Sequence, residues 1–142
     1  MDPEHIRLVA ALLDRHPWAG MATLAVLGGL AEQSNPNNVK VVIGNDDRAI
    51  SFTRSAAPWD RDRNGPAAVC HRHLGIYAYR RDVLLGYAQL PRSPLEDQER
   101  LEQLRALANG IGIACAVVKQ ATPGIDVRSD YDQFLIRRRK QP

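Results

Sequence analysis

Apolar residues recur along the chain with two periods, one helical and one extended, and these periods predict its elements. Asp2 followed by Pro3 is typical of a helix start, and apolar residues then repeat at helical spacing, so we expect a helix up to about Arg15. Residues 21–27 form a short apolar run bounded by glycines, which indicates a buried strand. The chain therefore opens with a helix followed by a strand.

The next segment has the pattern of an antiparallel sheet. Two β-prone runs, 39–43 and 49–53, flank a turn-forming stretch and predict a hairpin. Residues 56–66 are rich in proline, glycine and charge, so we expect a loop there that leads to a further strand over 74–79. Loops of this kind often carry functional residues.

Helices and strands alternate in the second half. Residues 93–96 (Ser-Pro-Leu-Glu) match a capping box with proline at the first helical position, and Gly110 is placed to end that helix in a left-handed cap. We further expect a buried strand over 115–119, a turn over 121–124 and a final helix over 129–138. The alternation favours a layered α/β or α+β domain.

Composition and charge narrow the class of protein. The chain has 142 residues, 44% hydrophobic and 25% charged, as in one globular domain, and no apolar run reaches the roughly 20 residues that span a bilayer. The acidic start does not resemble a secretory signal, so we expect a cytoplasmic location without membrane insertion. The positive net charge comes from the basic tail 137–140, which argues against nucleic acid as a partner. Cys70 and Cys115 predict no disulfide framework.

Several polar residues are candidates for binding, each beside a plainer interpretation. Arg54, at a predicted strand end, either pairs bidentately with a ligand carboxylate or is an ordinary surface arginine. Glu102 and Gln103, mid-helix in the prediction, either hydrogen-bond a polyol or belong to a solvent-facing row of charges. His71 and His73 alternate on a strand and either bind a metal together or are solvated or packed side chains.

Two further features lie in or after predicted loops. Residues 59–63 (Trp-Asp-Arg-Asp-Arg) most simply form internal salt bridges in a loop, with Trp59 packed beneath them. Asp126 follows a predicted buried strand, where a carboxylate is a suitable hard oxygen ligand for Mg²⁺. One carboxylate alone does not define a metal site. The common phosphate-loop, dinucleotide, nucleophile-elbow and zinc-protease motifs are absent from the sequence.

Taken together, these segments resemble the 3-deoxy-manno-octulosonate (KDO) cytidylyltransferases, also called CMP-KDO synthetases. The resemblance covers nearly the whole chain, and the order and spacing of its segments make it specific. The landmarks are residues 20–26 (Gly-Met-Ala-Thr-Leu-Ala-Val), 35–42 (Asn-Pro-Asn-Asn-Val-Lys-Val-Val), 52–55 (Phe-Thr-Arg-Ser), 58–63 (Pro-Trp-Asp-Arg-Asp-Arg), 72–77 (Arg-His-Leu-Gly-Ile-Tyr), 93–96, 101–105 (Leu-Glu-Gln-Leu-Arg) and 124–126 (Gly-Ile-Asp).

The resemblance implies an activity and a set of site residues. Enzymes of this family are nucleotidyltransferases that use Mg²⁺ to transfer CMP from CTP to KDO, release pyrophosphate and so activate the sugar for lipopolysaccharide synthesis. By this resemblance Asp126 binds Mg²⁺, and no catalytic side chain is implied. The implied contacts to KDO come from Arg54, His73, Tyr77, Glu102 and Gln103.

The resemblance reaches only the C-terminal half of the family. It implies part of a three-layer nucleotidyltransferase α/β fold with a small antiparallel β subdomain, so that residues 1–142 form a single incomplete domain for sugar binding and dimerisation. The family's nucleotide-binding loop and Gln-Gly-Asp-Glu-Pro segment are missing, so we expect a truncated homodimer that is inactive alone. Two alternatives stay open: a non-catalytic remnant that binds sugar acid or pairs with another subunit, and a cytidylyltransferase for another acidic sugar, such as an amino-KDO or a sialic acid.

Overall fold

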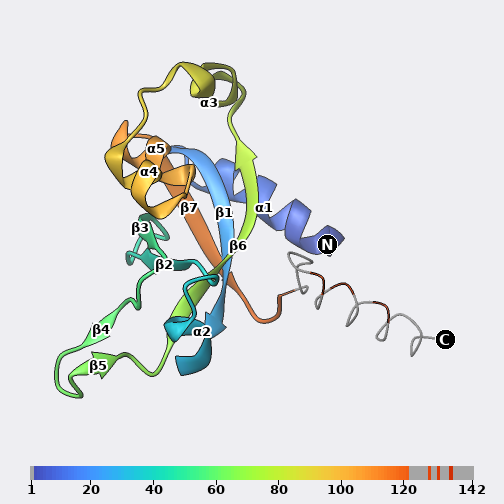
Figure 1. Cartoon of the computed structure of the whole chain (residues 1–142). Helices are drawn as coiled ribbons and strands as arrows, with labels where there is room; N and C mark the ends of the chain where they lie inside the picture. Colours follow the sequence, from blue (N-terminus) through green and yellow to red (C-terminus); the bar gives the residue numbers. More distant parts are fainter. Residues whose placement is uncertain (1, 122–127, 129–130, 132–134, 136–142) are drawn as a thin grey trace.

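The computed structural model describes residues 2–121, together with residues 128, 131 and 135. A five-stranded mixed sheet has the order β3-β2-β6-β1-β7, and β4 and β5 form a separate two-stranded sheet (Figure 1). The elements are α1 (Pro3–Arg15), β1 (Ala19–Gly28), α2 (Leu30–Ser34), β2 (Lys40–Ile43), β3 (Ala49–Thr53), β4 (Trp59–Asp60), β5 (Gly65–Pro66), β6 (Cys70–Tyr79), α3 (Arg81–Gly86), the 3₁₀ helix η1 (Tyr87–Gln89), α4 (Pro94–Glu99), α5 (Gln103–Ala108) and β7 (Gly112–Val118).

The first two elements lie where the sequence predicts them. Asp2 caps α1, because its carboxylate accepts a hydrogen bond from Glu4 N at 2.9 Å, and Pro3 occupies the first turn, where no N–H is needed. β1 runs antiparallel to β6 and parallel to β7, and almost every residue in it is buried. This burial explains the continuous apolar run, because a strand covered on both faces does not alternate in polarity.

β2 and β3 form the predicted antiparallel hairpin. The hairpin pairs with β6 only near Lys40 and then reaches back to the far edge of the sheet. There the carbonyl oxygen of Asp47 accepts a hydrogen bond from Cys115 N of β7 at 2.8 Å. The curled hairpin brings Phe52 into a core on one face of the sheet.

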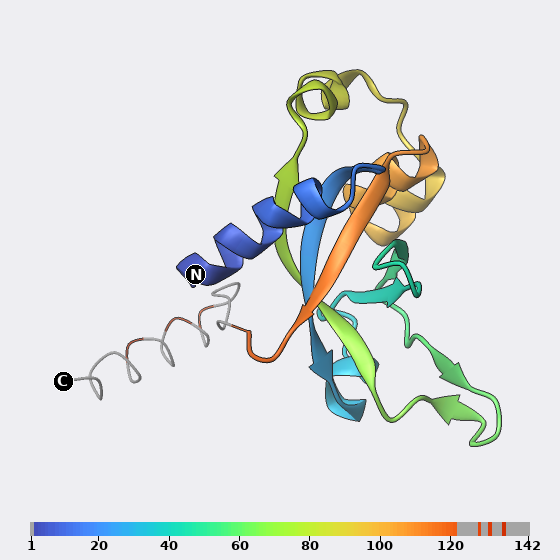
Figure 2. The same ribbon diagram turned by 180° about the vertical axis from the view of Figure 1, so that it is seen from behind.

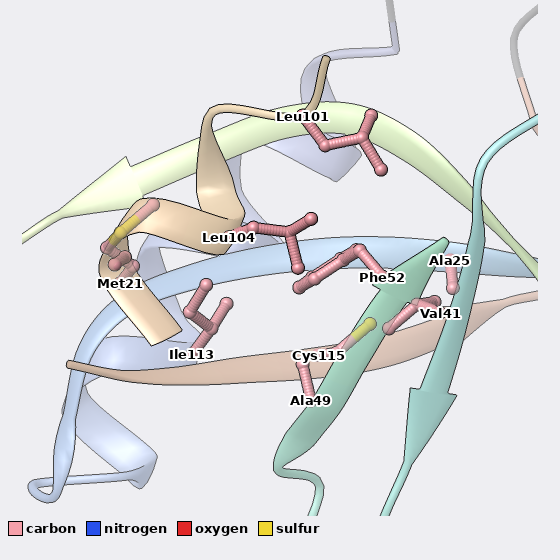
Figure 3. Close-up of a cluster of buried hydrophobic side chains, with 10 residues drawn as sticks. Met21, Ala25, Val41, Ala49, Phe52, Leu101, Leu104, Ile113 and Cys115 are labelled. Atoms are coloured by element: carbon pink, nitrogen blue, oxygen red, sulfur yellow. The ribbon is translucent and has the colours of Figure 1, made fainter. Parts of the chain in front are cut away.

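Two hydrophobic cores lie on opposite faces of the sheet. On one face α1 packs through Val9, Leu12 and Leu13, and Figure 2 shows this helix crossing in front of β6 toward the start of β1. On the other face Leu101 and Leu104, from the segment that contains α4 and α5, pack against the sheet and the hairpin (Figure 3). Helices on both faces of a mixed sheet, with a separate small antiparallel sheet, confirm the expected α/β fold class.

A bulge in β6 determines which side chains face each core. Tyr77 lies opposite Thr23, whereas His73 lies opposite the residue two positions further along β1, so residues 74–76 face a single residue of β1. Gly75, in the middle of the bulge, has a φ of 65°, a left-handed conformation that favours glycine. Because the bulge adds an even number of residues, His73 and Tyr77 remain on the same face of the strand.

The prediction of one continuous helix ending at Gly110 is wrong in the middle of that segment. The chain forms two short helices, α4 and α5, and Arg100 between them has a left-handed φ of 55°. Ser93 caps α4 by accepting a hydrogen bond from Leu95 N, and the Glu96 carboxylate accepts hydrogen bonds from Arg105 Nε at 2.8 Å and Nη2 at 2.5 Å. This ion pair joins the two helices across the break. Gly110, with a φ of 77°, has the predicted left-handed conformation.

The predicted loop 56–66 contains structure that the sequence did not reveal. β4 and β5 form a short hairpin, and the Asp60 carboxylate shapes its turn by accepting hydrogen bonds from Asp62 N and Arg63 N. Asp60 also pairs with Arg63, as expected, but Trp59 is 59% exposed and does not pack beneath the charges. The helices α2, α3 and η1 were not predicted either.

The predicted turn over 121–124 and final helix over 129–138 lie, apart from single residues, outside the described part of the chain. None of the described helices combines the length and apolarity needed to cross a membrane.

Candidate functional site

Aromatic rings form a continuous row on the face of β6 that is covered by α4 and α5. The ring centroids are 5.0, 5.3, 6.0 and 5.9 Å apart along the row, in tilted or edge-to-face arrangements typical of aromatic pairs. We call this the aromatic row, and its members are Phe52, His73, Tyr77, Tyr79 and Tyr87. It contains two of the predicted site residues, His73 and Tyr77, in direct ring contact.

His73 is held in the row as a neutral ring. Its Nε2 lies 2.8 Å from the hydroxyl oxygen of Thr23, and Thr23 Oγ1 also donates a hydrogen bond to the carbonyl oxygen of Ile76 at 2.7 Å. Burial lowers the pKa of His73 to about 4, because the charged imidazolium would lose its hydration. At neutral pH the ring therefore supplies polar contacts without positive charge. Within the described part of the chain no group of three metal-binding side chains occurs, so His71 and His73 do not form part of one there.

Tyr77 carries a buried hydroxyl group that has no hydrogen-bond partner among the described residues. Burial raises the pKa of this phenol, and the nearby Glu102 carboxylate raises it further, so the hydroxyl stays protonated. A buried hydroxyl without a partner costs roughly 1–3 kcal/mol, and native proteins rarely leave one without a reason. The group is available to donate to, and accept from, a ligand.

Glu102 and Gln103 lie at the start of α5 instead of mid-helix, because of the break at Arg100. The Glu102 side chain is exposed, and its backbone carbonyl accepts a hydrogen bond from Tyr87 Oη at 2.6 Å. Gln103 is 2% exposed. The interpretation of this segment as a solvent-facing row of paired charges is therefore wrong for Gln103, which is buried, and for Arg105, whose partner is Glu96.

Arg54 lies just beyond the end of β3, where α4 holds it in place. Its backbone N donates to Glu99 Oε2 at 2.9 Å and its Nε donates to the Glu99 carbonyl at 2.8 Å, while Nη1 donates to the Pro36 carbonyl at 3.1 Å. A guanidinium has five N–H donors, so the remaining donors still suffice for a carboxylate. Glu99 is itself fixed by a 2.6 Å hydrogen bond from Thr53 Oγ1.

Lys40 supports the Arg54 segment from inside the fold. The side chain is completely buried, and its Nζ donates to the carbonyl oxygens of Asn35, Asn38 and Arg54 at 3.1, 2.7 and 2.6 Å. Burial lowers the pKa of Lys40, but the carbonyl oxygens replace the lost hydration. One ammonium group therefore ties the loop before β2 to the end of β3.

The predicted residues fall into two groups. His73 and Tyr77 belong to the aromatic row and Glu102 lies near Tyr77, whereas Arg54 lies at the end of the hairpin strand that supplies Phe52. Gln103 follows Glu102 at the start of α5. Asp126 lies outside the described residues. A hollow of about 730 Å³ lies between the start of α1 and the end of β7, and a second one of about 310 Å³ lies beside Arg48, and neither is lined by the described candidates.

Sequence reasoning missed two residues that organise this site. Thr23 contacts His73 across 50 positions, and its only signal is a single hydroxyl within an apolar run. Glu99 contacts Thr53 and Arg54 across 46 and 45 positions, and nothing in its local sequence distinguishes it from a surface acid.

These features define a mixed α/β protein with a partly buried polar site on one face of its sheet. A model of the cytidylyltransferase family matches residues 1–115. The chain therefore belongs to the cytidylyltransferase family.

Two similar relatives are named for particular sugar acids. A 3-deoxy-manno-octulosonate cytidylyltransferase of Rhodopirellula baltica is 42% identical over 144 residues, which cover 96% of this chain and 58% of that protein. An 8-amino-3,8-dideoxy-manno-octulosonate cytidylyltransferase of Shewanella woodyi is 42% identical over 132 residues, which cover 92% of this chain and 53% of that protein.

A solved structure shares the fold. It is described as CMP:2-keto-3-deoxy-manno-octonic acid synthetase complexed with CTP, and it is 34% identical to this chain with a TM-score of 0.91. The match covers 100% of this chain and 58% of that one. The chain thus spans a little over half the length of the proteins it matches.

Proposed function

We propose that this chain forms the sugar-acid site of an enzyme that transfers CMP from CTP to KDO, and that the chain alone binds KDO without turnover. Relatives at 42% identity carry this specificity in their names. The observation that carries the proposal is the unpartnered, buried hydroxyl of Tyr77 beside a neutral His73. Such groups suit a ligand rich in hydroxyls, because both donors and acceptors are offered in a site shielded from water.

The acidic group of the sugar requires a different partner. His73 is neutral, so it does not balance a carboxylate. Arg54 retains unused N–H donors, and its backbone and side chain are fixed by Glu99. We assign the KDO carboxylate to Arg54, and the hydroxyl groups to His73, Tyr77, Glu102 and Gln103. An arginine suits this role because its planar fork binds both carboxylate oxygens.

Magnesium belongs to the same proposal, with Asp126 as its ligand. A carboxylate oxygen is a hard donor that suits Mg²⁺, and the ion would supply charge neutralisation to the phosphates of CTP. The described residues add no cluster that could hold the ion. The proposed role therefore rests on the donor chemistry of Asp126 and on the family match.

Homodimerisation and a cytoplasmic location complete the proposal. Apolar side chains are exposed around α2 and the β4–β5 hairpin, and a second copy of the chain would cover them. These residues are Leu27, Leu30, Trp59 and Val69. A cytoplasmic location is supported by two free cysteines, both buried, and by the need for a supply of CTP.

A binding and turnover experiment tests the function. We expect calorimetric titration with KDO to detect binding, and Arg54→Lys to weaken it at least tenfold because a bidentate pair is lost. Arg61→Lys, on the exposed β4–β5 hairpin, is the matched control and should bind as the parent chain does. With CTP, KDO and Mg²⁺ we expect no pyrophosphate release. Failure to bind KDO would refute the sugar site, and robust release would refute the claim that the chain is inactive alone.

A further inference from the structure

Thr23 makes two contacts that a single hydroxyl group satisfies in only one way. The residue is completely buried in β1. Its Oγ1 lies 2.7 Å from the carbonyl oxygen of Ile76 and 2.8 Å from His73 Nε2. A carbonyl oxygen only accepts hydrogen bonds, so the one hydroxyl hydrogen of Thr23 is directed at Ile76. The bond to His73 then requires a hydrogen on Nε2.

The bulge in β6 keeps this arrangement in place. Ile76 belongs to the three residues that lie opposite one residue of β1, next to the left-handed Gly75. Its carbonyl oxygen accepts the hydrogen bond from the Thr23 hydroxyl. If His73 carried its hydrogen on Nδ1, the Thr23 oxygen would face two acceptors with one hydrogen, and one buried acceptor would be left unpaired.

The second ring nitrogen then has a defined role. The ring is neutral, so a hydrogen on Nε2 leaves Nδ1 as an acceptor. Within the described part of the chain no donor is hydrogen-bonded to Nδ1, and the ring is flanked by Phe52 and Tyr77. An acceptor attracts a hydroxyl group and repels a carboxylate. His73 is therefore suited to the hydroxyl groups of a sugar and not to its acidic group.

We propose that Thr23 is a positioning residue that fixes His73 in the Nε2–H tautomer, so that Nδ1 accepts a hydrogen bond from a hydroxyl group of the sugar. The ligand part of this inference rests on the proposed function, whereas the tautomer part concerns the free protein. The two parts are therefore tested separately.

Nitrogen NMR of the free protein tests the tautomer. In protein labelled with ¹⁵N-histidine, we expect His73 Nε2 to resonate as a protonated nitrogen and Nδ1 as an unprotonated one, with the signal identified by its loss in His73→Gln. Thr23→Val removes the hydroxyl at nearly constant shape and should shift the ring to a mixture of tautomers. Thr23→Ser retains the hydroxyl and should preserve the parent signal, which also guards against misfolding of the valine variant. A parent ring protonated on Nδ1, or a valine variant with an unchanged tautomer, would overturn the inference.

Titration with KDO tests the ligand part. We expect Thr23→Val to bind KDO roughly five- to tenfold more weakly, the equivalent of one lost hydrogen bond, and Thr23→Ser to restore binding. KDO analogues that each lack one hydroxyl sharpen the test. One analogue should bind the parent chain more weakly than KDO does, whereas the valine variant should bind this analogue and KDO equally, as expected for a coupled pair. Parent-like binding by Thr23→Val would overturn this inference alone, while absence of KDO binding by the parent chain would overturn the proposed function.

Discussion

Alternate residues of β6 face two different cores, and the two faces differ in how well their polar groups are satisfied. Toward α1 the strand presents Leu74 and Ile76, which pack in an apolar core around Leu12. Toward α4 and α5 it presents His73 and Tyr77, and within the described part of the chain the Tyr77 hydroxyl has no hydrogen-bond partner. The first face stabilises the fold by removing apolar surface from water, whereas the second gives up stability to keep polar groups available. A single strand thus gives one apolar face and one polar face by its two-residue period.

The largest expected effect comes from breaking the apolar face. Leu12→Ala should lower the free energy of unfolding by about 2–5 kcal/mol, because the side chain is 1% exposed and its removal leaves a cavity. Urea unfolding followed by circular dichroism measures this change. Ile6→Ala, on the same helix but 54% exposed, is the control and should change stability by less than about 0.5 kcal/mol. Similar losses in both variants would contradict the assignment of this face to stability.

The next effect is a pH dependence that belongs to the polar face. Burial lowers the pKa of His73 from 6.5 to about 4, so the unfolded state binds one more proton than the native state between these values. Stability should therefore fall as the pH is lowered from 6.5 toward 4, by about 3 kcal/mol in total. Denaturant unfolding at a series of pH values checks this, and His73→Gln should flatten the curve above pH 4.5. A flat parent curve would show that His73 is not buried as a neutral ring.

Gly75 connects the two faces, because its left-handed conformation shapes the bulge between them. Gly75→Ala should destabilise the fold by about 1–2 kcal/mol through backbone strain, although nothing lies within 4 Å of the added methyl group. Gly86→Ala is a matched control, since that glycine is equally unobstructed but has a φ of −85°. Gly86→Ala should be as stable as the parent chain or slightly more stable. Equal losses at both positions would remove the argument for strain in the bulge.

The smallest effect has opposite signs at two tyrosines of the aromatic row. Tyr77→Phe removes an unpaired buried hydroxyl and should raise stability by about 0.5–1 kcal/mol while weakening KDO binding. Tyr87→Phe loses the 2.6 Å hydrogen bond to the Glu102 carbonyl and should lower stability by about 1 kcal/mol. Thermal unfolding and KDO titration of both variants give the comparison. A loss of stability in Tyr77→Phe would mean that its hydroxyl has a partner in the free protein.

Local sequence patterns were sufficient for the elements whose signals are local. The cap at Asp2, the apolar run of β1 and the turn between β2 and β3 all depend on neighbouring residues. The break between α4 and α5 at Arg100 could not be predicted from neighbouring residues. There the contacts of Glu96 with Arg105, and of Glu99 with the end of β3, outweigh the preference for one continuous helix.

The candidate site shows the same division. His73, Tyr77 and Gln103 were nominated through a resemblance in motif order, and the structure adds the burial of Gln103 and the unpaired hydroxyl of Tyr77 among the described residues. Thr23 could not be identified in this way, because its role depends on a histidine and a carbonyl oxygen at least 50 positions away. The neutral state of His73 depends on its burial in the fold and was equally out of reach.

The buried ammonium of Lys40 allows local opening of the fold to be measured by chemical modification. Three backbone carbonyl oxygens surround its Nζ, and the side chain has no exposed surface, so an amine-acylating reagent reaches it only when the fold opens. Lys119 is exposed and reacts in the native state, which provides an internal reference within the same molecule. The rate of Lys40 acylation, measured by mass spectrometry, therefore reports the rate at which the segment that holds Arg54 opens.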